Sequence, residues 1–420
     1  MSTTTDTAYN TMLNENVTNK LLDLELKKRN FIYNQIPQDK NWLLNNNYVL
    51  PHIAGVASSV RFGKLVASNN IRNSKPVRGY ESVHKEMWGA IQFNAKDLMI
   101  HDKVSEQNFL KLLPDELERH MDYMAQVLGQ NICSGKAVDA VTVDGDASGN
   151  ITISNPERVQ IRQYVEFLSD AVVVAITGYV KSVNINTGAL VIVTTPDGAT
   201  PVDLSTLLVA DNAKLYCQDQ ATEGFYSIID LLLPQSAGGS ATLHNVNKLQ
   251  SPQMQSVYAD GSSWTSGTLL KNIFKHYVKT RKVGSGSPSD VIMSYNNYGA
   301  AVNSIENQKG AFNVMPGKSS AEQFAWDEIS IGGYLSNGRP VKLVAIQEMN
   351  DSDMVFFDKS AFTFASNGGM RKQKTPDGLS YFTERTVDGY VYTTDTCLMG
   401  QLICKQAFKN GLVNKLAITY

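Results

Sequence analysis

The sequence predicts an α+β protein that carries a small all-β module as an insertion. A single long amphipathic segment at 114–134 has helical periodicity. The region from about 137 to 219 consists of short β-branched runs separated by Asn, Gly and Pro. Helical and strand patterns then alternate to the end of the chain, without an internal repeat or a low-complexity tract.

Composition narrows the class of protein. The chain has 420 residues, 38 Lys and Arg against 40 Asp and Glu, and 42% hydrophobic residues. This length predicts two or three core-forming units, because single cores stop growing at about 250–300 residues. A dedicated nucleic-acid binder would show a basic excess, since cations supply most of its non-specific affinity. Because this chain has none, nucleic-acid binding is not its expected main role.

The sequence shows no pattern typical of a secreted or membrane-spanning protein. The four cysteines form no CxxC pair and are too sparse for a disulfide scaffold, so we expect small buried side chains in a reducing compartment. The start, "MSTTTDTAYN", resembles neither a signal nor a transit peptide. The most apolar run, from Ala171, is shorter than the roughly 18 residues that a membrane span needs. We expect a soluble protein made in the cytosol.

The N-terminal third predicts an arm and a long hairpin. Residues 1–55 contain one short helical pattern in an otherwise extended arm. Val60–Val66 and Val83–Phe93 read as two strands joined by a polar connection too long for an ordinary hairpin loop. Between Arg61 and Glu86 lie six basic residues against two acidic ones. A hairpin of this kind should have a partner outside its own core.

The segment "LLPDELERHMDYMAQVLGQNICSG" predicts the longest helix. Pro114 suits the first turn, the acidic residues after it suit the positive end of the helix dipole, and Gly135 suits the C-terminal cap. One face is expected to be buried; it carries Leu117, Met121, Met124, Leu128 and Ile132.

Later segments predict a hairpin and a second helix. The string "SVNINTGALVIV" predicts two strands around an Asn-Thr-Gly turn within the β module. The string "TLLKNIFKHYVKTRKVGSG" predicts an amphipathic helix with Ser266 as its cap, Gly284 as its stop, and a buried face. That face holds Leu270, Ile273, Phe274, Tyr277 and Val278. "DVIMSY", "RPVKLVAIQEM" and "DMVFFDKSAFTFA" predict core strands, and the C-terminal stretch predicts β structure.

Motifs for catalysis are absent from the sequence. It has no GxGxxG, GxxxxGK[ST], HExxH or GxSxG, and no histidine pair at metal-ligand spacing. His120 and His276 are predicted to be solvated or capping residues. "DGDASGNITISN" from Asp144 resembles part of a calcium loop, but Asn155 stands where a bidentate Glu is needed, so a turn is preferred. The basic cluster "MRKQK", Met370–Lys374, is interpreted as a solvated loop tip, with a phosphate or partner contact as the alternative.

The order of elements resembles the major capsid proteins of tailed bacteriophages with the HK97-type fold. "LPDELERHMDYMAQVLGQNICSG" resembles the spine helix, "GTLLKNIFKHYVKTRKVGSGSPSDVIMSYNNYG" the axial domain, and "YTTDTCLMGQLICKQAFKNGLVNKL" the return to the peripheral domain. The resemblance implies six regions. They are an N-terminal arm (1–55), an extended β-hairpin loop (56–104), the peripheral-domain spine helix (105–136), an inserted β-rich domain (137–219), the peripheral-domain continuation with the axial domain (220–378), and the peripheral-domain C-terminal return (379–420).

The resemblance also implies a function. It implies a virion structural protein that assembles in the host cytoplasm, through pentamers and hexamers, into an icosahedral shell around phage double-stranded DNA. Expected partners are other copies of the chain, a separate scaffolding protein and a portal, with decoration proteins as a further candidate. Weak non-specific DNA contacts and no membrane are also expected. No enzymatic activity, cofactor or metal is expected. Intersubunit contacts of the extended loop with acidic groups are assigned to Arg61, Lys64, Arg72, Lys75 and Arg78.

Other interpretations stay open at this point. Encapsulin-like nanocompartment shells share the fold and would be distinguished by binding of a cargo peptide. A sequence-independent nucleic-acid binder would use the basic arm, but such proteins interleave aromatic residues with the charges, and Ser68–Gly79 contains no aromatic residue. Some relatives crosslink the loop through a lysine, for which Lys64, Lys75 and Lys85 are available.

Overall fold

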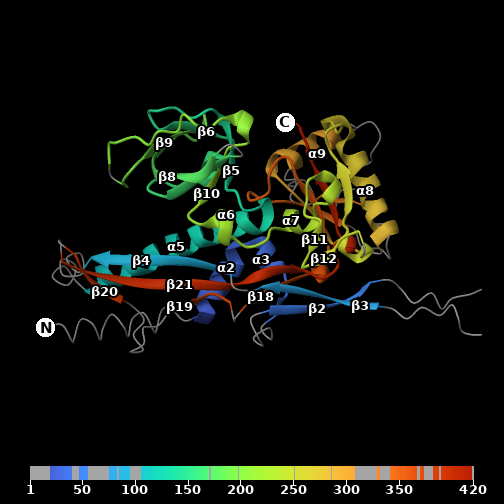
Figure 1. Ribbon diagram of the computed structural model, residues 1–420, viewed down its shortest axis with the longest axis horizontal. Coiled ribbons are helices and arrows are strands. Elements are labelled where there is room, and N and C mark those ends of the chain that lie inside the picture. Colours follow the sequence, from blue (N-terminus) through green and yellow to red (C-terminus); the bar gives the residue numbers. More distant parts are fainter. Residues whose placement is uncertain are drawn as a thin grey trace, which may run out of the picture. The chain divides into compact units, whose positions relative to one another are not determined.

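The computed structural model describes residues 19–39, 47–54, 75–82, 85–94, 106–169, 172–196, 198–249, 251–284, 286–307, 329–331, 341–366, 369–372, 382–386 and 389–418. The chain forms two compact units, each built from separate stretches of sequence. The first unit takes in the described parts of 1–34, 84–226 and 366–401; the second takes in those of 35–83, 227–365 and 402–420. Helices and several sheets occur together, so the predicted α+β class is confirmed (Figure 1).

The N-terminal helices belong to the first unit. α2 (Asn19–Arg29) and α3 (Phe31–Gln35) lie where the sequence predicts a short helix. α2 ends in Lys27, Lys28 and Arg29, cations that suit the negative end of the helix dipole. It is joined to the longest helix by an ion pair between Arg29 and Asp122. The next residue, Asn30, donates from Nδ2 to the Ala125 carbonyl at 3.1 Å.

The longest helix, α5, runs from Glu106 to Ser134. Pro114 therefore lies inside it, and the prediction that Pro114 opens the helix is wrong. The preceding stretch, "EQNFLKLL", consists mostly of good helix formers and continues the helix toward the N-terminus despite the cost of an interior proline. The predicted C-terminal cap is confirmed, because Gly135 has a left-handed φ of 100°. Four residues of the predicted stripe are buried: Met121, Met124, Leu128 and Ile132.

The long strand β21 (Gly389–Cys404) organises the sheet of the first unit. β4 (Lys85–Asn94) pairs antiparallel along one edge, from Asn94 opposite Val391 to Lys85 opposite Gly400. β20 (Phe382–Thr386) and β19 (Arg371–Lys372) pair with the other edge. α5 packs against β4 in the same unit (Figure 1).

The predicted pairing of Val83–Phe93 with Val60–Val66 lies outside the described residues, but the sheet gives the second strand a partner that the sequence did not suggest. The second strand exists as β4, but its partner is β21, about three hundred residues later in the chain. β21 offers β4 ten consecutive partners. Residues 60–66 themselves lie outside the described part of the chain.

The predicted all-β module is a closed barrel in the first unit. Its strand order is β10-β5-β6-β9-β8-β7. The strands are β5 (Asp139–Val143), β6 (Asn150–Ile153), β7 (Tyr164–Ser169), β8 (Val172–Val183), β9 (Ala189–Val193) and β10 (Lys214–Cys217). Closure leaves no free sheet edge. Fully buried side chains such as Phe167, Val180 and Ile192 fill the interior.

The hairpin between β8 and β9 confirms the predicted Asn-Thr-Gly turn. Asn184 accepts hydrogen bonds at Oδ1 from the backbone N–H of Asn186 and of Thr187. Gly188 closes the turn with φ of 73°. A Cβ at this position would lie 2.2 Å from the Ile153 carbonyl oxygen, so glycine is required on two grounds.

The second unit contains a mixed six-stranded sheet of order β13-β22-β17-β14-β16-β15. The strands are β13 (Val257–Asp260), β14 (Asp290–Met293), β15 (Ile329–Ile331), β16 (Val341–Ala345), β17 (Met354–Phe357) and β22 (Gly411–Asn414). Helices α8 (Leu269–Gly284) and α9 (Tyr295–Asn307) cover it and share its core, which includes Tyr277, Ala301 and Phe356 (Figure 1).

Two details of α8 differ from prediction. Phe274 is 40% exposed, whereas Leu269 and Ile273 form the buried face. Ser266 is not the cap, because the helix is preceded by the 3₁₀ turn η5 (Ser266–Thr268), which begins with a capping box between Thr265 and Thr268. The buried face also includes the polar side chains of His276 and Thr280, which the apolar pattern left out, and it is therefore turned away from Phe274.

Shorter elements complete the described chain. In the first unit they are η1 (Pro156–Arg158), η2 (Val209–Asp211) and α6 (Gln220–Glu223). In the second unit they are β1 (Gln38–Asp39), α7 (Ile228–Leu232), η3 (Gln235–Ala237), β11 (Thr242–Leu243), β12 (Val246–Asn247), η4 (Pro252–Met254), η6 (Lys359–Ala361), β18 (Phe362–Ser366) and η7 (Ala407–Lys409).

Candidate functional site

A two-stranded ribbon in the second unit is the first candidate site. β2 (Asn47–Ala54) and β3 (Lys75–Ser82) pair antiparallel over eight residues, from Asn47 opposite Ser82 to Ala54 opposite Lys75. They form a sheet of their own. Among the described strands neither outer edge of the ribbon is paired, and such edges are templates for pairing with another chain.

The five predicted contact residues lie in the second strand of this ribbon or in the segment that joins its two strands. Lys75 and Arg78 lie in β3, opposite Ala54 and Pro51 respectively. Arg61, Lys64 and Arg72 fall in the connection between β2 and β3, outside the described residues. All five basic residues therefore belong to β3 or to the segment between β2 and β3, and their role as intersubunit contacts stays a prediction.

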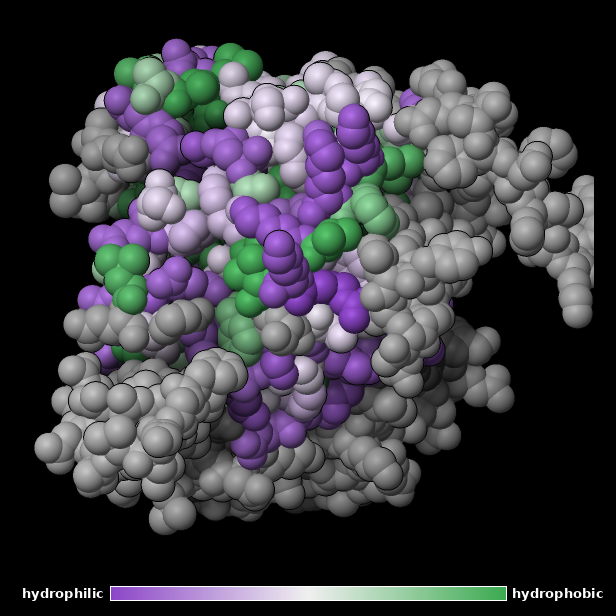
Figure 2. Space-filling model, turned by 90° about the vertical axis from the view of Figure 1, so that its right-hand side faces the viewer, coloured by the Kyte–Doolittle hydropathy of each residue, from purple (hydrophilic) through white to green (hydrophobic). Residues whose placement is uncertain are grey.

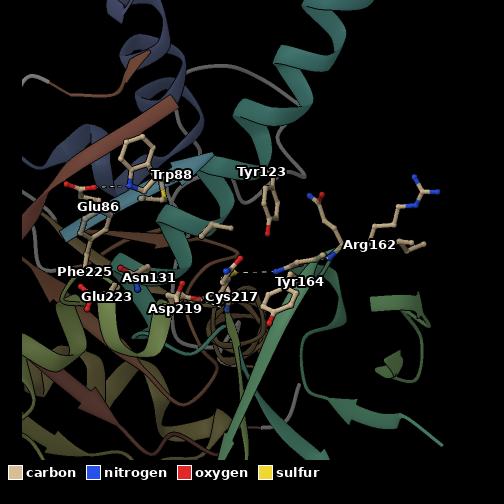
Figure 3. A pocket seen from close by; sticks show the side chains of 18 residues that line it. Glu86, Trp88, Tyr123, Asn131, Arg162, Tyr164, Cys217, Asp219, Glu223 and Phe225 are labelled. Atoms are coloured by element: carbon tan, nitrogen blue, oxygen red, sulfur yellow. Dashed lines mark hydrogen bonds between the residues drawn. The ribbon is translucent and has the colours of Figure 1, made fainter. Parts of the chain in front are cut away.

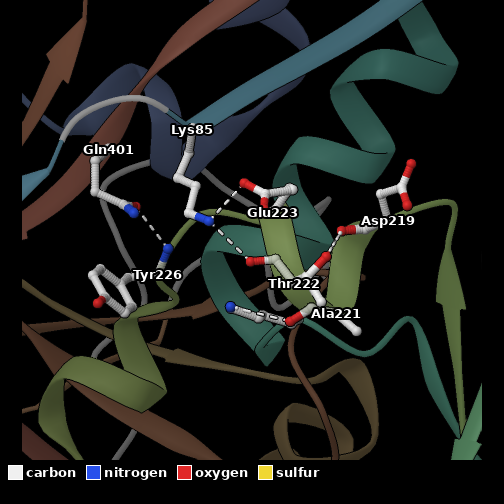
Figure 4. Close-up of polar contacts among 8 residues, drawn as sticks. Lys85, Asp219, Ala221, Thr222, Glu223, Tyr226 and Gln401 are labelled. Atoms are coloured by element: carbon white, nitrogen blue, oxygen red, sulfur yellow. Dashed lines mark hydrogen bonds and ion pairs between the residues drawn. The ribbon is translucent and has the colours of Figure 1, made fainter. Parts of the chain in front are cut away.

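Lys85 ties the start of β4 to the segment that follows the barrel. Its Nζ donates to Glu223 Oε2 at 2.7 Å and to the Thr222 carbonyl at 2.9 Å (Figure 4). The hydrogen bond and the charge of Lys85 lower the pKa of the Glu223 carboxyl. Lys136 donates to the neighbouring Ala221 carbonyl at 3.2 Å. Two lysines therefore hold α6, and Lys85 makes its contacts within its own chain.

A cavity of about 810 Å³ is the second candidate site. It lies in the first unit between β4, α5, the barrel residues 160–164 and the segment 217–225 (Figure 3). Trp88, 48% exposed, donates from Nε1 to Glu86 at 2.9 Å on its wall. Asn131 lines the cavity with both amide atoms lacking a partner among the described residues.

The titratable groups of the cavity do not suit nucleophilic catalysis. Burial raises the pKa of the Cys217 thiol to about 11. Burial also raises the pKa of Tyr123, which shares a hydrogen bond with Cys217. Gln163 donates to the same sulfur at 3.3 Å. Both groups remain protonated at neutral pH, whereas a nucleophilic cysteine needs a lowered pKa.

Two helical histidines face the sheets, so their predicted solvated or capping role is wrong; His276 is buried and His120 is partly buried. His276 is buried with its ring 4.9 Å from that of Phe356. His120 contacts Thr396 Oγ1 at 3.0 Å through Nε2. Burial lowers the pKa of each to about 4. Helical charge patterns around them were misleading, because the histidines point to the sheet side of their helices.

The acidic loop from Asp144 is a hydrogen-bonded turn. Asp146 accepts from the backbone N–H of Ser148 and of Asn150, each at 2.8 Å, and from the Asn150 amide. Asp144 accepts from the Val209 N–H at 2.7 Å. Across the described ranges no group of three His, Cys, Asp or Glu residues is placed to hold a metal ion.

The structure also places the cysteines, the basic cluster at 370–374 and the lysines of α8. All four cysteines are free; Cys133 and Cys404 are buried, and Cys217 and Cys397 are partly buried. Of the cluster Met370–Lys374, Met370 is buried and Arg371 is exposed in β19, while the last two residues lie outside the described part. The sequence prediction missed a row of exposed lysines on α8, although the four-residue spacing of Lys271, Lys275 and Lys279 was visible.

No protein-family model matches the chain, and no curated protein matches it. Solved structures that are similar to it include capsid and shell proteins. "Cyanophage A-1(L) capsid asymmetric unit" has a TM-score of 0.46 and 10% identity, and the match covers 91% of this chain and 90% of that one. "Capsid of native GTA particle computed with C5 symmetry" has a TM-score of 0.45 and 9% identity, with 91% and 89% covered. The "virus-like particle from Pyrococcus furiosus" has a TM-score of 0.42 and 6% identity, with 94% and 97% covered.

None of the described helices has the length and apolarity to cross a membrane.

Proposed function

We propose that this chain is a shell-forming capsid protein. In full, it is a major capsid protein of a tailed bacteriophage that assembles through pentamers and hexamers into an icosahedral shell around double-stranded DNA. The observation that carries the proposal is the β2–β3 ribbon. Its two strands pair with each other, and neither outer edge is paired within the described chain.

The physical reason is the marginal stability of two strands alone. A two-stranded hairpin is at best marginally stable in water, and three or more strands or a packing partner are needed. Eight paired residues on each strand make this ribbon long for an isolated hairpin. A neighbouring copy of the chain would supply that packing partner, and a repeated subunit supplies it at every position of a shell.

Charge supports the same conclusion. The stretch 55–74 contains Arg61, Lys64 and Arg72 and no acidic residue, and Lys75 and Arg78 follow in β3. We propose that these five cations meet acidic groups of the adjacent copy. Each exposed pair contributes only about 0–1 kcal/mol, but every subunit of a shell repeats the set. The electrostatic part of assembly should therefore weaken with salt.

Partners follow from the same proposal. The shell subunit would work with a separate scaffolding protein, a portal and decoration proteins, and would be a virion component assembled in the host cytoplasm. Burial keeps the Cys217 thiol and the Tyr123 hydroxyl protonated in the cavity of the first unit, which agrees with a structural role for this part of the chain.

A charge-reversal variant tests the ribbon's role. R61E/K64E/R72E should remain folded, with an unchanged thermal midpoint, and should sediment as small species under conditions in which the wild-type chain sediments as particles. The matched control is K181E/K214E/K359E, which changes the net charge equally at two exposed lysines and the partly buried Lys214, all far from the ribbon in sequence. Assembly by the ribbon variant at wild-type yield would contradict the proposed contact.

A further inference from the structure

The outward face of α8 carries a row of lysines that the proposed function has not used. Lys271, Lys275, Lys279 and Lys282 are all exposed. Successive helical residues turn by about 100° and rise 1.5 Å, so these four lie within roughly 80° of arc and along about 16 Å of helix. Figure 2 faces the side on which α8 lies in Figure 1 and shows hydrophilic side chains gathered there, with hydrophobic ones between them.

The row lacks compensating charge. α8 has no acidic residue in its first turn, and its sixteen residues contain no Asp or Glu. Within the described chain, Lys271, Lys275 and Lys282 form no hydrogen bond or ion pair. Lys279 donates to a neutral group, the Tyr258 carbonyl, at 3.4 Å. The nearby Asp260 carboxylate pairs with Lys415.

This arrangement is unfavourable for the subunit alone. Lys271 lies near the positive end of the helix dipole, where a cation is destabilising. Lys271, Lys275 and Lys279 follow each other at i, i+4, and like charges at this spacing repel. The helix dipole favours Arg281 and Lys282, because they lie in the last turn. It does not favour the other three lysines of the row, which lie before that turn. An external anion that spans the row would relieve the repulsion.

We infer that the outward face of α8 is a sequence-independent contact surface for the phosphate backbone of a nucleic acid. Phosphates form a regular line of single charges, and lysines that neutralise them give affinity without base readout. The inference rests on the proposed shell function only for the identity of the nucleic acid as double-stranded DNA.

Two other polyanions fit less well. An acidic protein partner would have to present carboxylates at the spacing of the lysines, whereas a nucleic-acid backbone carries its phosphates in a regular line. A membrane-surface helix must insert its apolar face into lipid, but the apolar face of α8, which includes Leu269, Ile273 and Tyr277, is already buried in the core of its unit.

The test compares two triple variants of the full chain. Binding to a 25-base-pair duplex of random sequence is measured by fluorescence anisotropy over a salt series. Because log K falls with log salt by about 0.9 for each phosphate neutralised, K271Q/K275Q/K282Q should make the slope shallower by about 2.7. K181Q/K214Q/K359Q, with the same change in charge, should leave the slope unchanged. Both variants should keep the wild-type thermal midpoint.

The proposal fails if both variants weaken binding equally, or if neither does. It also fails if the α8 variant loses affinity for poly-glutamate or for phosphatidylserine vesicles while keeping that for the duplex. Particle formation by the α8 variant is scored separately by sedimentation. Loss of DNA binding by the α8 variant with normal particles supports the inference. If the wild-type chain binds the duplex through the row but forms no particles, only the proposed shell function is contradicted.

Discussion

Lys85 Nζ lies 2.7 Å from Glu223 Oε2, which joins the first residue of β4 to the last residue of α6. The same ammonium donates to the Thr222 carbonyl at 2.9 Å. Gly400 of β21 stands opposite Lys85 in the ladder, and Gln401, the next residue, accepts from the Tyr226 N–H at 2.7 Å (Figure 4). The exit from the barrel is therefore fastened to two neighbouring strands of the first unit.

Removing Lys85 should raise the pKa of Glu223. In K85M the carboxyl loses the hydrogen bond and charge that lower its pKa, so an NMR titration should find it near the ordinary glutamate value. Because the folded pKa is depressed, the contact contributes stability above the ordinary pKa and loses it as the pH falls through the folded value. K415M is the control: it should raise the pKa of Asp260, now about 2, and leave Glu223 unchanged.

His276 should make the protein less stable in mild acid. Burial holds its folded pKa at about 4, while the unfolded chain titrates near 6.5. The unfolded state therefore binds more protons between these values, and stability falls as the pH drops from 6.5 to 4, by up to about 3 kcal/mol. Urea unfolding of wild type and H276Q at pH 7 and pH 5 should show a smaller loss in the variant. Equal losses of unfolding free energy in the two proteins would contradict a buried, neutral His276 side chain.

Two isoleucines of the barrel offer a matched test of its core. Ile192 in β9 is fully buried, whereas Ile185 in the adjoining turn is 70% exposed. I192A should cost about 2–5 kcal/mol of unfolding free energy, because it removes buried methyl groups and leaves a cavity. I185A should change it by less than about 0.5 kcal/mol. Similar effects of the two substitutions on chemical denaturation would contradict the closed barrel.

Alanine substitutions at two glycines distinguish the cost of backbone strain from the cost of steric overlap. Gly188 and Gly238 both have positive φ, 73° and 92°. A Cβ at Gly188 would lie 2.2 Å from the Ile153 carbonyl, whereas one at Gly238 would meet nothing within 4 Å. G238A should cost about 1 kcal/mol from the left-handed backbone alone, and G188A should cost clearly more. Thermal unfolding of both variants measures the difference, and equal losses would contradict the tight turn.

Local patterns predicted much of the fold. Helical spacing identified α5 with its buried residues Met124 and Leu128, and the glycine at 135 marked its end. The Asn-Thr-Gly turn between β8 and β9 was also predictable, because its hydrogen bonds join residues within six positions of each other. The five basic residues of the predicted contact set were assigned by resemblance and charge, and their contacts stay a prediction.

Features that depend on distant residues could not be predicted. The partner of β4 is β21, and no local pattern distinguishes this partner from a nearer strand. The cavity arises where β4, α5 and the barrel meet, so its lining is scattered from Glu86 to Phe225. The burial of His276 depends on Phe356 in β17. The lysine row of α8 is the exception, since its spacing was present in the sequence and only its exposure required the structure.

Electron microscopy of the purified wild-type chain tests the central claim most directly. The proposal predicts closed polyhedral particles of uniform size, and under the same conditions R61E/K64E/R72E should yield folded but unassembled subunits. A monodisperse monomer of the wild-type chain, at concentrations and salt that favour assembly and with its partner proteins supplied, would contradict it.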